Sequence, residues 1–148
     1  MIRILSILLL FAGSPSLADI GGEWIPPSGD AVLSIEVGET VDIYLQATLD
    51  PRLDEHNPRP SLRQRPLIGL KIGSGFQRRA DGWHGGRVYD PAGGRTYSAV
   101  LKQLDADRLE VRGYLGIRLM GRTQIWTRRE VWHRRVNAML GEVCHHAP

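Results

Sequence analysis

The sequence predicts an all-β protein, a small antiparallel up-and-down barrel of about eight strands followed by a short C-terminal amphipathic helix. Three observations support this fold class. Apolar and polar residues alternate from Gly22 to Arg129, short polar turns interrupt the alternation, and the apolar spacing becomes helical after Arg129. Closure into a barrel is expected because an open row of short strands leaves two unpaired edges.

The segment before the barrel has the composition of a secretory signal peptide. Arg3 supplies a positive charge, Ile4–Ala12 is an apolar run, and Ser16-Leu17-Ala18 places small residues before a cleavage site. The apolar run is about half of the roughly 20 residues that a membrane-spanning helix requires, so we expect no transmembrane segment. We therefore expect residues 1–18 to be removed after Ala18 and the remaining protein to be periplasmic or secreted.

Four stretches show the strand alternation most clearly. Each places its apolar residues on one face and its polar residues on the other, as expected of a half-buried strand. They are Ala31–Val37, Thr40–Ala47, Ile68–Ile72 and Arg108–Arg112. Polar turns at Gly38, Ala80 and Asp105 separate neighbouring strands. The pattern therefore predicts a meander of strands joined by tight turns.

The glycine-rich segment GGRVYDPAGGRTYSAVL at 85–101 permits two interpretations, a phosphate-binding loop and a β-hairpin. A phosphate-binding loop requires a helix after its glycines. Here Gly94 is followed by the strand-forming run Arg95–Leu101, and Asp90-Pro91 is a typical start of a turn. We therefore predict a hairpin in which Gly93 or Gly94 adopts a positive φ.

One long segment, Asp50–Pro66, contains four prolines and no alternation. Connections longer than about 12 residues are uncommon in compact domains and often serve as lids or binding loops. Two interpretations remain open for this segment. It is either a mobile surface connection or a functional loop that uses Asp54, His56 and Asn57.

The C-terminal segment is predicted to form an amphipathic helix. Its apolar residues recur at helical spacing on one face, at Trp132, Val136, Met139, Leu140 and Val143. We expect this helix to cover one end of the barrel, and the tract from Cys144 to be a frayed tail rather than a metal site. Cys144 is the single cysteine, so no intrachain disulfide is expected, and pairing between chains stays open. The expected domains are 1–18 for the signal peptide, 19–129 for the barrel and 130–148 for the helix and tail.

Charge is distributed unevenly along the chain. Residues 19–57 contain nine acidic side chains and one basic side chain, whereas residues 58–148 contain seven acidic and seventeen basic side chains. We expect acidic and basic strands to become neighbours and neutralise each other, and the alternative is a basic face for an anionic partner. Nucleic acid is not an expected partner, because the basic residues are not interleaved along an aromatic platform.

Two long stretches carry a resemblance to a known family. DEHNPRPSLRQRPLIGLKIGSGF at 54–76 and GWHGGRVYDPAGGRTYSAVLKQLDADRLEVRGYLGIRLMGRTQIWTR at 82–128 resemble the bacterial exported family catalogued as domain of unknown function 2147. The resemblance extends over about Ile20 to Arg129 and implies a small exported protein with a lipocalin-like β-barrel and no established activity. It does not extend to the helix after Arg129.

A looser resemblance to lipocalins concerns how the barrel closes. Gly22-Glu23-Trp24 resembles the glycine-x-tryptophan of the first lipocalin strand, whose indole lies beneath an arginine of the last strand. Arg128 is the corresponding arginine here. A cation–π contact of this kind contributes roughly 0.5–2 kcal/mol, so the resemblance implies a structural role for Trp24 and Arg128 in joining the first strand to the last.

The expected function is the binding of one small apolar or amphiphilic molecule by the barrel. The alternative is a cell-envelope protein-interaction or structural module that uses the 50–66 loop or the C-terminal helix. Aromatic walls and polar groups for a ligand are supplied by the candidates Asp54, Asn57, Tyr89, Tyr97, Arg112, Tyr114 and Trp126. Ordinary cross-strand packing is an equally open role for these aromatic residues, and the alternation places Arg112 opposite the inward-facing Leu109 and Val111.

An enzyme is the less favoured hypothesis. Asp54 or His56 is a candidate general base, but no serine or cysteine nucleophile motif is present. The five histidines are also too dispersed for the usual spacing of a metal site. We therefore expect no catalytic residue, no metal and no cofactor.

Overall fold

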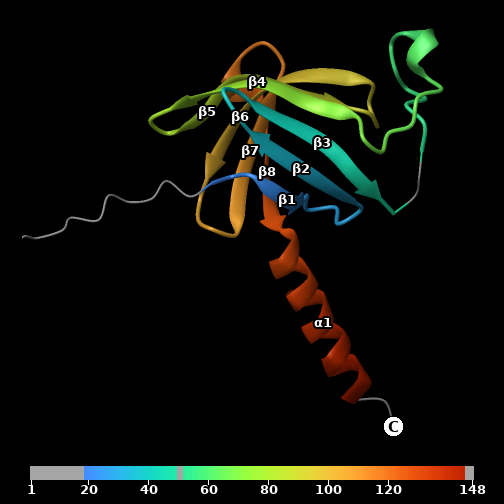
Figure 1. The fold of residues 1–148 in the computed structure, drawn as a ribbon, viewed down its shortest axis with the longest axis vertical. Helices are drawn as coiled ribbons and strands as arrows, with labels where there is room; N and C mark the ends of the chain where they lie inside the picture. Colours follow the sequence, from blue (N-terminus) through green and yellow to red (C-terminus); the bar gives the residue numbers. More distant parts are fainter. Residues whose placement is uncertain (1–18, 50–51, 146–148) are drawn as a thin grey trace, which may run out of the picture.

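The computed structural model describes residues 19–49 and 52–145, with side chains described as far as Met139. The predicted signal peptide lies outside the described residues. Eight antiparallel strands follow one another around a closed barrel, and β8 pairs back with β1 (Figure 1). The strands are β1 Gly22–Ile25, β2 Ala31–Val37, β3 Val41–Thr48, β4 Lys71–Arg79, β5 Gly82–Asp90, β6 Arg95–Gln103, β7 Arg108–Tyr114 and β8 Arg122–Arg128. The predicted fold class is confirmed.

The alternation of Ile68, Leu70 and Ile72 predicted a strand, and the first half of that prediction is wrong. β4 begins only at Lys71, and Ile68 is 47% exposed. The preceding residues form a turn, in which Gly69 has a φ of 84° and the Leu70 amide donates to the Leu67 carbonyl. The turn between Leu67 and Leu70 interrupts the strand pattern here, and glycine permits the positive φ that this turn uses.

The glycine-rich segment forms the predicted hairpin, since β5 and β6 pair from Asp90↔Arg95 onward. Gly94 takes the positive φ, at 62°. A Cβ at this position would lie 1.9 Å from the His56 carbonyl oxygen of the long β3–β4 connection. Glycine therefore permits both the turn conformation and the close approach of the long connection to the hairpin.

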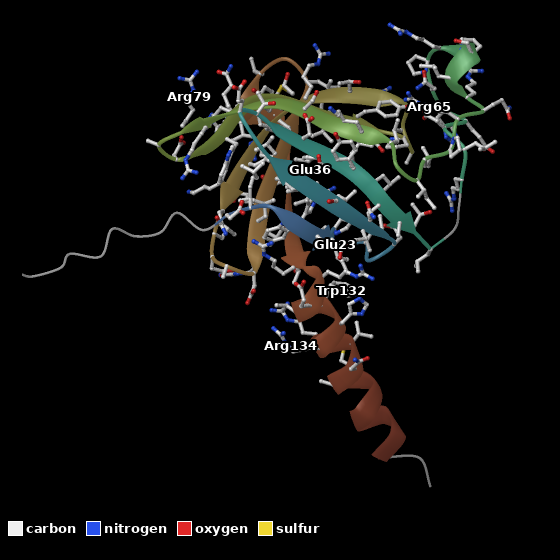
Figure 2. The ribbon with its side chains drawn as sticks, viewed as in Figure 1. Glu23, Glu36, Arg65, Arg79, Trp132 and Arg134 are labelled. Atoms are coloured by element: carbon white, nitrogen blue, oxygen red, sulfur yellow. The ribbon has the colours of Figure 1, made fainter. Side chains whose placement is uncertain are left out.

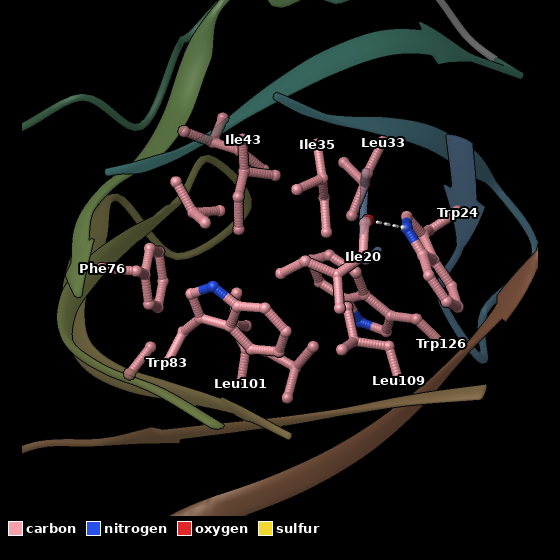
Figure 3. Packing of buried hydrophobic residues seen from close by; sticks show 14 of the residues in the cluster. Ile20, Trp24, Leu33, Ile35, Ile43, Phe76, Trp83, Leu101, Leu109 and Trp126 are labelled. Atoms are coloured by element: carbon pink, nitrogen blue, oxygen red, sulfur yellow. Dashed lines mark hydrogen bonds between the residues drawn. The ribbon is translucent and has the colours of Figure 1, made fainter. Parts of the chain in front are cut away.

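The barrel interior is a packed apolar core (Figure 3). Trp24, Ile43, Phe76, Leu101 and Leu109 have no exposed surface. A space of the size of a water molecule beside any of these side chains would leave part of it exposed, so none adjoins them. The sequence left open whether the barrel encloses a ligand cavity or is filled by side chains. Around these five residues the barrel is filled by side chains.

Trp24 and Arg128 meet where the barrel closes. They are register partners between β1 and β8, and the Arg128 guanidinium carbon lies 4.2 Å from the centroid of the Trp24 ring. The indole Nε1 donates to the Ile20 carbonyl oxygen at 2.8 Å. The guanidinium also donates to three carbonyl oxygens, those of Asp19, Gly21 and Ala106.

Helix α1, Arg129–His145, continues directly from β8 and projects away from the barrel (Figure 1). Our expectation that it covers a barrel end is wrong. Its first turns alone are attached, through an Arg129–Glu23 ion pair of 2.7 Å and through Trp132, whose ring lies against Gly29. Of the helix side chains as far as Met139, only Val131 is buried.

The prediction of a frayed tail from Cys144 onward is wrong for the first two of its residues, and residues 146–148 lie outside the described ones. The helical backbone includes Cys144 and His145. The side chains of these two residues lie outside the described ones.

The acidic first part of the chain is partly neutralised by the basic second part, as expected. Asp42 pairs with Lys71 across β3 and β4 at 2.5 Å, and Glu23 pairs with Arg129. Within the described residues, none of the helices combines the length and apolar character needed to cross a membrane.

Candidate functional site

Three of the predicted site residues come together where the long β3–β4 connection contacts β5. Asp54 is fully buried, and its carboxylate accepts a hydrogen bond from the Tyr89 hydroxyl at 2.5 Å and from Asn57 Nδ2 at 2.7 Å. Arg65 adds Nε at 2.8 Å and Nη2 at 2.7 Å. These four residues are called the Asp54 cluster below; Figure 2 shows Arg65 on the connection to the side of the barrel.

The connection itself is folded locally so that it can present Asp54. An isolated bridge pairs Leu53 with Pro66, the Asn57 amide donates to the Asp54 carbonyl, and the 3₁₀-helix η1 spans Pro60–Leu62. From residue 52 onward the connection therefore has a defined structure, which supports the interpretation of an anchored loop over that of a loose surface connection.

The donors of the cluster are divided unequally between the two oxygens of the Asp54 carboxylate. Oδ2 accepts from Asn57 and from Arg65 Nε and also lies 2.7 Å from Arg65 Nη2, whereas Oδ1 accepts from the Tyr89 hydroxyl. Burial acts to raise the pKa of Asp54, but the hydrogen bonds from Tyr89, Asn57 and Arg65 together outweigh it and lower the pKa below its usual value. These contacts favour the ionised carboxylate and join the long connection to Tyr89 of β5.

The cluster predicts a pH dependence of stability. The pKa of Asp54 is lower in the folded state than in the unfolded state. Its contribution to stability is therefore complete above the unfolded-state pKa of about 3.9 and is lost as the pH falls through the folded-state pKa. Burial and the Asp54 hydrogen bond raise the pKa of Tyr89 to about 12, so the contribution of Tyr89 to stability is complete below about pH 10 and is lost as the pH rises through about 12.

We expect the stability difference between the native protein and Asp54→Asn, measured by urea denaturation, to stay constant from pH 8 to about 5 and to shrink below about pH 4. A difference that stays constant down to pH 3 would contradict the assignment.

The other predicted ligand residues do not converge on one site. Trp126 is buried in the core (Figure 3), and Tyr97 lies on the same face of β6 as the buried Ala99 and Leu101. Tyr114 lies on the outward face of β7 together with Arg112, because it pairs with Ser98 rather than with the buried Ala99. Arg112 faces outward and donates to the carbonyl oxygens of Arg118 and Leu119 and to Thr123 Oγ1.

A pocket of about 220 Å³ lies at the β4–β5 turn, on the opposite side of the molecule from the Asp54 cluster. Figure 2 shows Arg79 on this turn, far from Arg65. The pocket is lined by Arg78, Arg79, Asp81, Trp83, Lys102 and Gln103, and is called the turn pocket below. Its polar side chains are three cations, one carboxylate and one amide, so its charge is positive.

Two features make the turn pocket more than a surface depression. The Arg78 guanidinium carbon lies 5.2 Å from the centroid of the Trp83 ring, and Trp83 is 6% exposed and belongs to the core. Gln103 Nε2 is buried and has no hydrogen-bond partner among the residues that the structure describes. Buried amide donors are nearly always paired in native proteins, so this donor is an exception among the residues that line the pocket.

Sequence reasoning missed the turn pocket. Arg78-Arg79 and Lys102-Gln103 are far apart in the sequence and belong to strands that alternate like any others. The signal that was available is the cationic pair next to the turn at Ala80-Asp81, since residues on either side of a tight turn lie next to each other.

Comparisons with known proteins identify the family. Residues 22–128 match the profile of the family DUF2147, which is described as an uncharacterized protein conserved in bacteria. The chain belongs to this family. The match ends with β8, so α1 lies beyond the family region.

A solved structure with a similar fold is protein HP1028 from the human pathogen Helicobacter pylori, described as belonging to the lipocalin family. It is 22% identical to this chain, covers 75% of this chain and 83% of its own, and has a TM-score of 0.68. This likeness shows a lipocalin-like barrel. A comparison with curated proteins finds no match.

Proposed function

We propose that this DUF2147 barrel is an exported binding module without enzymatic activity that holds the anionic head group of a small amphiphile in the turn pocket. The observation that carries the proposal is the lining of the turn pocket, in which three cations, Arg78, Arg79 and Lys102, face one carboxylate, Asp81. Arg79 and Lys102 supply charge complementarity for a carboxylate or phosphate. The signal-peptide composition of residues 1–18 supports export.

The size of the turn pocket limits what enters it. Pockets for whole drug-sized ligands have about 300–1,000 Å³, whereas the turn pocket has about 220 Å³. The packed core leaves no depth for an acyl chain beside Trp24 or Phe76. We therefore infer that the head group is bound in the pocket and that the tail lies outside, against the exposed edge of Leu104, which is 40% exposed next to Gln103.

The Asp54 cluster supports a non-enzymatic function. Asp54 was the candidate general base, but it is fully buried and its carboxylate accepts from Tyr89, Asn57 and Arg65. The second candidate, His56, is exposed and contributes its carbonyl oxygen to the contact with Gly94. Neither residue has the arrangement in which a positioned base meets a substrate in a pocket.

A thermal-shift experiment tests the proposal. A ligand that binds only the folded protein stabilises it by about 2.7 kcal/mol at one hundred times its Kd. We expect laurate and lysophosphatidate to raise Tm, and uncharged lauryl alcohol and inorganic phosphate alone to raise it less. Arg79→Gln with Lys102→Gln should weaken the charged ligands about ten-fold, since each exposed ion pair contributes up to about 1 kcal/mol.

The matched control is Arg95→Gln with Arg87→Gln, which removes two cations of the neighbouring strands outside the turn pocket. This control should bind as tightly as the native protein. Equal ligand shifts in the pocket variant and the control, or no shift with any charged amphiphile, would exclude the turn pocket as the site.

A second candidate function is protein interaction in the cell envelope, and the position of α1 favours it. The helix extends away from the barrel, and Met139 on its predicted apolar face is 64% exposed. The long β3–β4 connection is a weaker candidate for this role because the Asp54 cluster fixes it to β5. The two functions differ in where substitutions act, at the turn pocket for a small ligand and along α1 for a protein.

A further inference from the structure

The β7–β8 loop, residues 115–121, presents large apolar side chains to solvent. Leu115, Ile117, Leu119 and Met120 are 53%, 61%, 86% and 77% exposed. Single exposed apolar side chains are common on protein surfaces, but several within one short segment indicate an interaction site. This loop does not line the turn pocket and is not part of the Asp54 cluster, although the charge of Arg118 is among the causes that lower the pKa of Asp81 in the pocket.

The loop and its edges carry cations and no acidic residue. Residues 111–122 contain three arginines and no aspartate or glutamate. Arg118 lies within the loop, Arg122 directly follows it, and both are exposed. Apolar side chains flanked by cations are the composition of segments that bind the interface of an anionic membrane, where apolar groups enter the acyl boundary and cations contact lipid phosphates.

Several backbone amide and carbonyl groups of the loop are hydrogen-bonded within the protein. The 3₁₀-helix η2, Arg118–Met120, has amide donors of Met120 and Gly121 bonded to carbonyls of Ile117 and Arg118. Arg112 donates from β7 to the carbonyl oxygens of Arg118 and Leu119. Backbone groups that approach the hydrocarbon region lose hydrogen bonds to water, and Arg112 compensates for this loss at two carbonyl groups of the loop.

The position of the loop leaves it accessible. It precedes β8, whereas α1 follows β8, so the two project from opposite ends of the same strand (Figure 1). Self-association through this loop is disfavoured, because a two-fold contact would bring the arginines of both copies together without an acidic partner in the segment.

We propose that the β7–β8 loop docks the protein on an anionic phospholipid surface, with Leu119 and Met120 inserted at the acyl boundary and Arg118 and Arg122 on lipid phosphates. The occupant is the bilayer surface, and the contact is peripheral and reversible. This proposal is independent of the ligand in the turn pocket.

Vesicle co-sedimentation of the exported protein, with its N-terminus verified by mass spectrometry, tests the proposal. We expect binding to vesicles of phosphatidylcholine with phosphatidylglycerol, weaker binding to phosphatidylcholine alone, and release by salt. Arg118→Gln with Arg122→Gln should weaken binding to the anionic vesicles about twenty-fold, at about five-fold per arginine. Leu119→Ser with Met120→Ser should weaken it about a hundred-fold, because two apolar insertions are lost.

Matched substitutions on α1 serve as controls. Arg134→Gln with Arg135→Gln removes the same charge, and Met139→Ser removes the same side chain as Met120→Ser; these controls should bind like the native protein. All substituted side chains are exposed, so folding is retained, which circular dichroism verifies.

Three results would overturn the proposal. They are absence of binding to anionic vesicles, equal losses in the loop and α1 variants, and a change of oligomeric state in Leu119→Ser with Met120→Ser without a change in vesicle binding. The last result would assign the loop to contact with a second copy.

Discussion

Trp24→Ala is expected to lower the free energy of unfolding by about 3–5 kcal/mol, as the deletion of a fully buried aromatic side chain does. Trp24 has no exposed surface and packs in the core between the first and last strands. The substitution removes the ring beneath Arg128 and leaves the Ile20 carbonyl without its indole donor. Urea denaturation of the two proteins measures the difference.

Arg128→Lys is the informative companion variant. Lysine keeps the charge but lacks the planar fork that donates to Asp19, Gly21 and Ala106 together, so the loss should be smaller, about 1–2 kcal/mol. Arg95→Lys, an exposed arginine at the start of β6, should change stability by less than about 0.5 kcal/mol. Unchanged urea midpoints in Trp24→Ala and Arg128→Lys would exclude a role in barrel closure.

Asp54→Ala is expected to be the most damaging substitution outside the core, with a loss of about 3 kcal/mol. It removes the acceptor shared by Tyr89, Asn57 and Arg65, and these donors would remain in a half-buried position without it. Leaving buried donors unpaired costs more than the net value of the hydrogen bonds themselves. Tyr89→Phe removes one of these bonds and should cost about 1 kcal/mol.

Glu55→Ala is the control for this prediction, because it removes the adjacent carboxylate, which is exposed. It should leave stability within about 0.5 kcal/mol of the native value. Limited proteolysis of the connection at 58–65 should accelerate in Asp54→Ala and stay unchanged in Glu55→Ala. Equal cleavage rates in both variants would show that Asp54 does not anchor the connection.

Much of the barrel followed from local pattern. The alternation at Ala31–Val37 corresponds residue for residue to β2, and the turn at Asp90–Gly94 joins β5 to β6 as predicted. The prediction was wrong at Ile68–Leu70, where apolar alternation coincides with a turn around Gly69. Periodicity reports which side chains are apolar, but it does not show where a hydrogen-bonded turn such as that between Leu67 and Leu70 interrupts the strand.

The candidate sites were predicted less well, for a physical reason. The sequence identified Asp54, Asn57 and Tyr89 separately as polar or aromatic candidates. Their side chains come into hydrogen-bonding contact only because the 52–70 connection folds onto β5. The turn pocket and the basic apolar loop depend on residues whose local sequence is ordinary for a strand or turn. Whether a cation lines a pocket or faces solvent is decided by neighbouring strands that are distant in sequence.

The sequence by itself determined the family, the all-β class, the order of most strands and the existence of the C-terminal helix, because these depend on short-range periodicity and on turn residues. The tertiary structure alone decided that the barrel interior is filled by side chains and that α1 projects from the barrel rather than covering it. It also decided that Asp54 joins the long connection to Tyr89 of β5. These features depend on volumes and hydrogen-bond donors contributed by strands far apart in the chain, and no local pattern encodes how such contributions add up.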